Sequence, residues 1–302
     1  MRGARHRRGT GIHLAEDALY VVQFSHGRSA IALEAAVREV MPCLFAPSHL
    51  ASDELRLELA EFLRQVSRQY GLRYENPCLS LDRRVTLLKR RPVIQGDQKA
   101  SREQMRWEAE QFLTSGAEEY GMGFWWTRRY GFVVAARRRI LDLYLELCSE
   151  AGIGTPRFDL EPFALGNAAE AAGVLDDRAG GLLLELCAWG AHVVLLREGE
   201  LEGASSCRWS DGEEARGEVL ADCVQALLEE AGDPGPPARI WLSGSEVGSD
   251  TGAREWAREV ESRLSVASAL LDPFAGVGAD QMAHGAAYAV AAGLAYRALS
   301  GR

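Results

Sequence analysis

The segment LLLELCAWGAHVVLLREGEL, residues 182–201, constrains the fold of this chain more than any other. Three leucines lead to Glu185, a Cys-Ala-Trp-Gly turn follows, and a second apolar run comes next, so the segment predicts a β-hairpin whose first strand is buried. Residues 11–24, GIHLAEDALYVVQF, predict a second hairpin with an acidic turn. Helical patterns come after both hairpins. Two hairpin-led halves indicate a duplicated α/β fold.

The first half is expected over residues 11–165, after a basic tail at 1–10. Ser52 or Asp53 caps a helix that ends at Gly71. Residues 83–152 read strand, helix, strand, strand, helix, which predicts a compact α+β insert. The elements expected in this half are strands at 30–42, 77–93 and 122–137, and helices at 52–71, 101–113 (with a capping box from Ser101 to Gln104) and 138–152.

The second half is expected over residues 166–302, with its last helix returning to the hinge between the halves. That helix is rich in alanine and glycine, which could suggest a membrane dimer motif. Arg297 and its modest length favour close packing at the hinge instead. The elements expected here are helices at 158–173, 213–231, 251–264 and 281–299, and a strand at 239–245.

Composition excludes several classes of protein. The chain has 302 residues and a net charge of −9, which argues against broad nucleic-acid binding. No run of eighteen apolar residues and no signal-peptide pattern is present. The six cysteines form no C-x-x-C pair, and the six histidines show no ligand spacing, so we expect reduced thiols and no metal site.

Several short stretches, in this order along nearly the whole chain, resemble PilM, the cytoplasmic actin-like protein of type IV pilus machines. MSHA-type pilus proteins and the cytoplasmic part of GspL from type II secretion share that fold. The stretches are RWEAEQFL, VVAARRRILDLYLELCSEAGI, DLEPFALGNAAE, LLREGEL, IWLSGS, LLDPFAGV and AAYAVAAGLAYRAL.

The resemblance implies an actin-like, ribonuclease H-like α/β fold: two halves around a cleft, with a ferredoxin-like insert in the first half at 83–152. In PilM proteins ATP lies in the cleft. The tail of PilN, a single-span membrane protein, docks against the first half near the insert. PilM couples the inner-membrane complex to cytoplasmic motor components.

The two hairpins depart from the residues that nucleotide binding requires in that family. Phosphate binding needs small residues at the turns, so that backbone N–H groups can approach. In the first hairpin Glu16 and Asp17 occupy the turn, where like charge would repel phosphate by about 4 kcal/mol at an effective dielectric constant near 20. In the second, Trp189 replaces a glycine and would be strained at positive φ. Its indole would also occupy phosphate space.

A third motif, SGSEVG at 243–248, is better preserved, but only 44 positions separate Gly199 from Ser243, so the second half looks shortened. We therefore expect a vestigial nucleotide site, without cofactor, metal or catalytic residues; bound ATP and Mg²⁺ are the alternative. The vestigial site comprises His13, Ala15, Tyr20, Glu185, Cys187, Trp189, Ser243 and Gly244.

His13 and Glu185 are expected to point into the same cleft. A carboxylate beside an imidazole resembles a general base with its orienting group. No nucleophile or oxyanion donor lies near them in the sequence, which favours a structural hydrogen bond.

A face for a partner is expected on the insert. In the strand FWWTRR one indole should face the core of the insert and the other outward. On the preceding helix Met105 and Phe112 should pack inward. The partner-binding candidates are Arg106, Glu110, Trp125, Trp126, Arg128 and Arg129.

The sequence thus predicts a cytoplasmic scaffold, peripheral at the inner face of the inner membrane. It would belong to a type IV pilus or related type II secretion-like platform and bind the tail of a PilN-like protein without hydrolysing ATP. An active actin-like ATPase of the same machine is the alternative. A sugar-kinase-like transferase ranks last, since no catalytic aspartate is visible.

Overall fold

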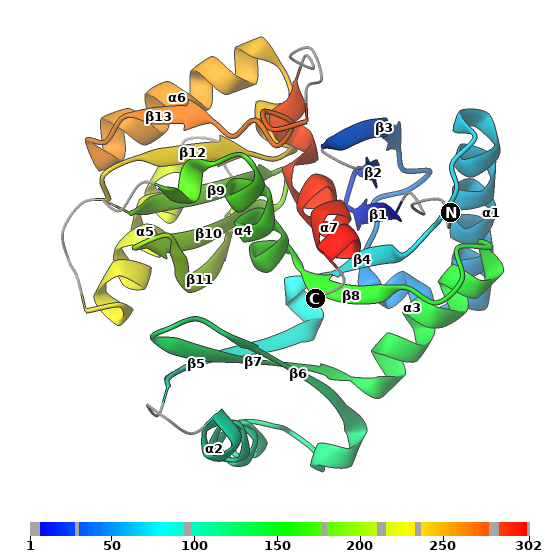
Figure 1. Cartoon of the computed structure of the whole chain (residues 1–302), viewed down its shortest axis with the longest axis horizontal. Coiled ribbons are helices and arrows are strands. Elements are labelled where there is room, and N and C mark those ends of the chain that lie inside the picture. The colour runs from blue at the N-terminus through cyan, green and yellow to red at the C-terminus, as the bar shows by residue number, and fades with distance from the viewer. Residues whose placement is uncertain are drawn as a thin grey trace, which may run out of the picture.

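The computed structural model describes residues 7–27, 30–93, 98–176, 180–209, 216–232, 237–277 and 284–300. Two five-stranded sheets form the two halves, and a separate three-stranded sheet lies below them in Figure 1. The two large sheets have the same plan: a meander of three antiparallel strands, then two parallel strands added beside the first. The predicted duplicated α/β fold is confirmed.

The sheet of the first half has the order β3-β2-β1-β4-β8. Helices α1 and α3 pack together beside it (Figure 1). Ser52 caps α1 by accepting the Leu55 N–H at 3.4 Å, and Gly71 ends it at φ 63°, as predicted. The elements are β1 (Arg7–Leu14), β2 (Ala18–His26), β3 (Ile31–Val40), α1 (Asp53–Tyr70), β4 (Pro77–Leu81), α3 (Arg138–Glu150) and β8 (Arg157–Leu160).

The expected basic tail ends sooner than predicted. Residues 1–6 lie outside the described residues, but β1 already begins at Arg7. The charge of Arg8 is offset by Glu34 at 2.8 Å and Glu75 at 2.9 Å, which lets a basic segment join a sheet.

The sheet of the second half has the order β11-β10-β9-β12-β13. Between β11 and β12 the described chain contains one helix, α5. The elements are β9 (Gly181–Cys187), β10 (Gly190–Arg197), β11 (Glu200–Arg208), α5 (Arg216–Glu230), β12 (Ile240–Ser243), α6 (Asp250–Leu264) and β13 (Ser268–Leu270).

The insert is a sheet of order β5-β7-β6 with α2 on one face (Figure 1). Its elements are β5 (Thr86–Pro92), α2 (Gln98–Glu110), β6 (Tyr120–Trp126) and β7 (Tyr130–Arg137). The helix expected to close the insert, α3, instead buries Tyr144, Leu147 and Cys148 in the core of the first half. The separate sheet and its helix therefore span a shorter segment than 83–152.

Two local predictions about α2 are wrong. Ser101 does not cap the helix, because α2 begins three residues earlier and Ser101 is buried within it. Phe112 lies beyond the helix end at Glu110, is 47% exposed, and stacks under the Lys89 ammonium at 4.5 Å. Met105 packs inward, as predicted.

Helices α4 (Glu161–Ala171) and α7 (Ala289–Ser300) lie between the halves. A Cβ on Gly11 would lie 1.9 Å from the Ala291 carbonyl oxygen, and one on Gly293 would lie 1.8 Å from that of Ala164. Close packing of the last helix at the hinge is therefore confirmed. Within the described ranges, no helix is long and apolar enough to cross a membrane.

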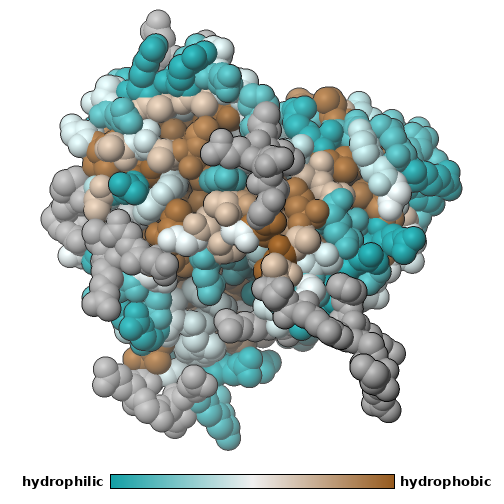
Figure 2. All heavy atoms as spheres, turned by 45° about the horizontal axis from the view of Figure 1, so that its top comes forward, coloured by the Kyte–Doolittle hydropathy of each residue, from teal (hydrophilic) through white to brown (hydrophobic). Residues whose placement is uncertain are grey.

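Short 3-10 helices complete the chain: η1 (Pro47–Ala51), η2 (Arg83–Val85), η3 (Ala117–Glu119), η4 (Val174–Asp176), η6 (Ser245–Val247) and η7 (Gly285–Tyr288). In the view of Figure 2, hydrophobic residues gather toward the middle of the molecule and hydrophilic residues dominate its right-hand side. Inside the molecule, one cluster of buried hydrophobic residues contains Ile12 of β1 and Leu183 of β9, so the apolar core continues between the halves.

Candidate functional site

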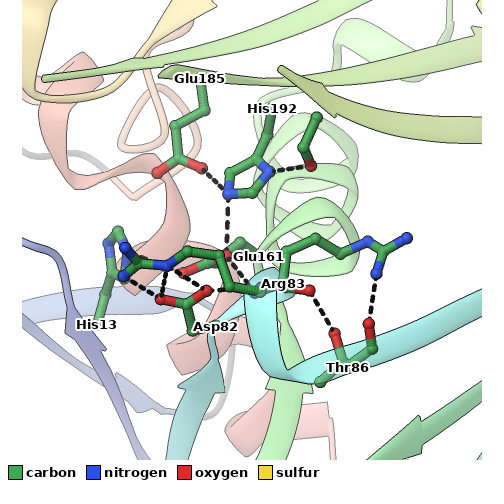
Figure 3. Close-up of polar contacts among 9 residues, drawn as sticks. His13, Asp82, Arg83, Thr86, Glu161, Glu185 and His192 are labelled. Atoms are coloured by element: carbon green, nitrogen blue, oxygen red, sulfur yellow. Dashed lines mark hydrogen bonds and ion pairs between the residues drawn. The ribbon is translucent and has the colours of Figure 1, made fainter. Parts of the chain in front are cut away.

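One buried carboxylate, that of Glu161, joins the two halves. Glu161, the first residue of α4, is only 6% exposed. Its Oε1 lies 3.5 Å from Nε2 of His13 on β1, and its Oε2 lies 2.9 Å from Nε2 of His192 on β10 (Figure 3). The backbone N–H of Arg83 also donates to Oε2, at 3.4 Å. The cluster thus connects the first half, the second half and the start of the insert.

A polar row crosses three strands of the second sheet. Glu185, His192 and Ser206 are direct neighbours in the strand register, so their side chains lie on one face. His192 Nδ1 lies 2.7 Å from the Ser206 hydroxyl, and His192 Nε2 lies 4.0 Å from Glu185. His192 and Glu185 are buried, whereas Ser206 is exposed at the sheet edge.

Burial and charge oppose each other in this cluster. Burial alone would lower the pKa of His192 and of His13, but Glu161, with a contribution from Glu185, raises both above the ordinary value. Burial would likewise raise the pKa of Glu161, yet the two imidazoles outweigh it and hold that pKa low. Glu185 has a raised pKa, chiefly because it is buried.

These shifts decide what the cluster can do chemically. Ser206, His192 and Glu161 follow the order hydroxyl, imidazole, carboxylate that activates a serine nucleophile. The raised pKa of His192 favours its protonated form, which is the poorer acceptor for a serine proton. The arrangement also links the two halves through buried ion pairs, and His192 Nδ1 and the Ser206 hydroxyl share a hydrogen bond. Sequence reasoning paired His13 with Glu185 and missed Glu161 and Ser206; the hairpin register could have shown Ser206.

The first expected phosphate hairpin fills its turn with its own hydrogen bonds and side chains. The Ala15 N–H donates to the Ala18 carbonyl at 3.0 Å. Tyr20 is fully buried, accepts a hydrogen bond from Arg38 Nε at 3.2 Å, and stacks on His13 with ring centroids 5.9 Å apart. The phenol and the imidazole thus fill the base of the cleft on this side.

The second hairpin and the third motif do the same. Cys187 is buried, and Trp189 is half-buried with its ring edge-on to His192 at 5.1 Å. Trp189 does not have positive φ, so the predicted backbone strain is absent. Ser243 Oγ donates to the Leu184 carbonyl at 3.0 Å, and the Gly244 N–H donates to that of Ala286 at 3.2 Å.

The partner-binding candidates do not share one face. Trp126 packs in the small core under α2, whereas Trp125 faces the main body and packs on Phe132 and Phe163. Arg128 is not free for a partner, since its Nε lies 2.9 Å from Glu200 Oε1 in the second half. Two further candidates, Arg106 and Glu110, pair with each other along α2 at 3.5 Å. The last candidate, Arg129, lies beside the ring of Tyr130.

A cavity of about 270 Å³ separates the insert from the first half, and we call it the insert groove. It touches consecutive residues 121–125 of β6 and 158–160 of β8. Successive side chains of a strand alternate between faces, so a run of consecutive residues marks a backbone edge. β6 and β8 are both edge strands of their sheets. The remaining lining residues are mostly apolar: Leu81, Val134, Ala136, Leu141, Phe163 and Arg297.

Comparison with solved structures identifies the fold. The chain superposes on a structure of the PilM–PilN type IV pilus biogenesis complex with a TM-score of 0.79, covering 96% of this chain and 98% of the other at 21% identity. The chain has the fold of PilM. The resemblance to PilM predicted from short stretches of sequence is therefore confirmed at the level of fold.

A second, more distant likeness agrees with the PilM fold. A Bacteroides thetaiotaomicron protein with an actin-like ATPase fold and unknown function gives a TM-score of 0.57, with 95% of each chain covered and 10% identity. No protein-family model matches the chain, and a search of curated proteins finds no match. Among the described residues, no group of three His, Cys, Asp or Glu side chains could hold a metal ion.

Proposed function

We propose that this chain is a cytoplasmic scaffold of a type IV pilus or type II secretion-like assembly platform. It binds the cytoplasmic tail of a PilN-like inner-membrane protein and so lies at the inner face of that membrane. The observation that supports this most is the likeness over 96% of the chain to a protein solved as a PilM–PilN complex.

The insert groove is the place we propose for the tail. Two unpaired strand edges, β6 and β8, face it, and an extended peptide can add its backbone hydrogen bonds to such edges. Its apolar lining, including Trp125 and Phe163, offers anchors for side chains of the tail. This location agrees with the docking near the insert that the sequence resemblance implies.

We further propose that the chain does not hydrolyse ATP. Phosphate binding in the cleft would need free N–H groups, but those of Ala15 and Gly244 already donate to backbone carbonyls. Tyr20, one of the residues of the expected vestigial site, is fully buried. The alternative is an active ATPase in which the two hairpins and the third motif rearrange when ATP binds.

The groove can be tested by filling it at Gly123. A Cβ on Gly123 would meet no atom within 4 Å, so Gly123→Trp should place an indole in the groove without disturbing the sheet. We expect this variant to bind a peptide of the PilN-like tail at least about tenfold more weakly in calorimetry, because the indole excludes the peptide.

Gly123→Ala is the matched control, since it adds only a methyl group in open space and should bind like the wild type. Equal affinity of the Trp variant would move the tail away from this groove. Absence of binding by the wild-type chain to any PilN-like tail encoded beside it would overturn the proposed function itself.

A further inference from the structure

The opposite edge of the insert faces a second cavity, of about 490 Å³, which we call the basic slot. It lies between the insert and the second half, where β5 and β11 run near each other in Figure 1. Its lining includes consecutive residues 88–91 of β5 and 203–208 of β11. As in the insert groove, such runs mark backbone edges, and both strands are at the edges of their sheets. The basic slot is therefore bounded by two unpaired strand edges.

The lining of the basic slot is strongly cationic, although the protein as a whole carries a net charge of −9. Six basic side chains and one acidic residue, Glu230, contribute to it. Carboxylates neutralise two of the six: Asp82 pairs with Arg84, and Glu108 pairs with Arg91. Of the other four, the Lys89 ammonium lies over the ring of Phe112 at 4.5 Å. The last three have no carboxylate within ion-pair distance in the described part of the chain; these are Arg83, Arg90 and Arg208.

Arg90 holds the two edges together at one end. Its Nη1 donates to the Glu202 carbonyl at 2.7 Å, and its Nη2 donates to the Glu230 carbonyl at 3.0 Å. Both acceptors are neutral backbone groups, so the positive charge of the guanidinium is not cancelled. An anion that enters the basic slot would meet this charge without displacing a salt bridge.

The edge of β11 offers backbone donors to the same space. The Trp209 N–H donates to the Trp189 carbonyl, toward the hairpin of β9 and β10. Since N–H groups alternate in direction along an antiparallel strand, those of Arg208, Ser206 and Ala204 point away from β10. The exposed Ser206 hydroxyl, held by His192, lies on the same strand.

We propose that the basic slot binds an extended acidic peptide, which pairs with the free edge of β11 while its carboxylates meet the uncompensated cations. The length of the two edges favours a peptide over a small anion, because residues 203–208 present about 20 Å of strand. Charge complementarity selects acidic side chains over basic ones. The partner is therefore an acidic segment of a protein other than the tail in the insert groove.

Fluorescence anisotropy with a labelled peptide of alternating Glu and Val, and with its Lys and Val counterpart, tests this proposal. We expect the acidic peptide alone to bind, and binding to weaken with added salt. Arg208→Glu should weaken it at least about fivefold, because an attractive charge becomes repulsive. Arg258→Glu, on the exposed face of α6, is the control with the same change of charge and should leave the affinity unchanged.

Ala204→Pro tests the backbone pairing separately, because it removes an outward N–H without breaking the ladder to β10. This variant should bind the acidic peptide more weakly, while its unfolding stays as cooperative as that of the wild type.

Equal binding of acidic and basic peptides, or no effect of the charge reversal in the basic slot, would overturn the proposal. Full competition by millimolar inorganic phosphate would show a small-anion site instead. Gly123→Trp should retain acidic-peptide binding, which separates this result from that of the proposed function.

Discussion

At the scale of single residues, the cleft is organised by one carboxylate that the sequence does not mark. Glu161 lies between two imidazoles, His13 from the first half and His192 from the second, all buried. Buried ion pairs tolerate the loss of one partner poorly, because the other charge remains desolvated, at a cost of about 3–5 kcal/mol. Glu161 therefore stabilises the contact between the two halves.

The same cluster predicts that stability falls as the pH rises above neutrality. The pKa values of His13 and His192 in the folded protein are raised above 6.5. Their contribution to the free energy of unfolding is therefore complete below pH 6.5 and is lost as the pH rises through the raised pKa values. The raised pKa of Glu185 acts in the same direction. Urea midpoints measured from about pH 6 to pH 9 should therefore decline.

Two variants show whether the cluster causes that decline. His192→Gln should lower stability at pH 6 and flatten the dependence above it, because one of the two titrating imidazoles is gone. His26→Gln, at the exposed end of β2, should keep the wild-type slope. A midpoint that rises with pH in the wild type would contradict the assignment of protons to these histidines.

At the scale of elements, the last helix depends on residues without side chains. Gly9 and Gly11 on β1, and Gly293 on α7, let backbones approach where a Cβ would lie within 3 Å of a carbonyl oxygen. The alanine-rich pattern of this helix indicates close packing, whereas the elements it packs on, among them β1 and α4, come from distant parts of the sequence.

Gly293→Ala tests this packing. In an exposed helix the change would stabilise by about 1 kcal/mol, through helix propensity. Here the new Cβ would lie 1.8 Å from the Ala164 carbonyl oxygen, so overpacking should win and the net loss should be about 1–3 kcal/mol. Thermal unfolding of Gly293→Ala beside Gly123→Ala, whose methyl group enters open space, gives the comparison. A stabilised Gly293→Ala would mean that α7 packs less closely.

At the scale of the whole molecule, the insert sets one sheet edge against each half. β6 faces β8 of the first half across the insert groove, and β5 faces β11 of the second half across the basic slot. Arg90 and Arg128 connect the insert to the second half. These contacts hold the insert to the second half, so a change in the angle between the halves would alter the insert groove more than the basic slot.

The proposed lack of ATPase activity gives a prediction at this scale. A ligand stabilises the folded state in proportion to the logarithm of its concentration over its dissociation constant. Mg-ATP should therefore leave the melting temperature of the wild-type chain unchanged. It should also leave that of the Trp189→Gly variant unchanged, because Tyr20 and Cys187 are still buried in the expected nucleotide site. A rise of several degrees in the wild type would favour the active ATPase.

The sequence alone determined the features that depend on local pattern. Hairpin periodicity and turn residues predicted the two hairpins, Ser52 and Gly71 predicted the ends of α1, and the ordered stretches predicted the PilM-like fold. The third strand of the second meander, β11, was missed. Local signals were insufficient for α2, since Ser101, which looks like a capping residue, is a buried residue within the helix.

Only the tertiary structure decided which distant side chains meet. In the sequence, Arg128 looks like a free cation. Its partner, Glu200, lies 72 positions further along the chain, so the pair forms only when the insert packs against the second half. Glu161 opens an ordinary helix and becomes the centre of the cleft because three other elements converge on it. The charge of the basic slot likewise arises from β5 and β11 together. Periodicity reports how each element buries its own face, whereas the pairing of edges and charges depends on how separate elements pack.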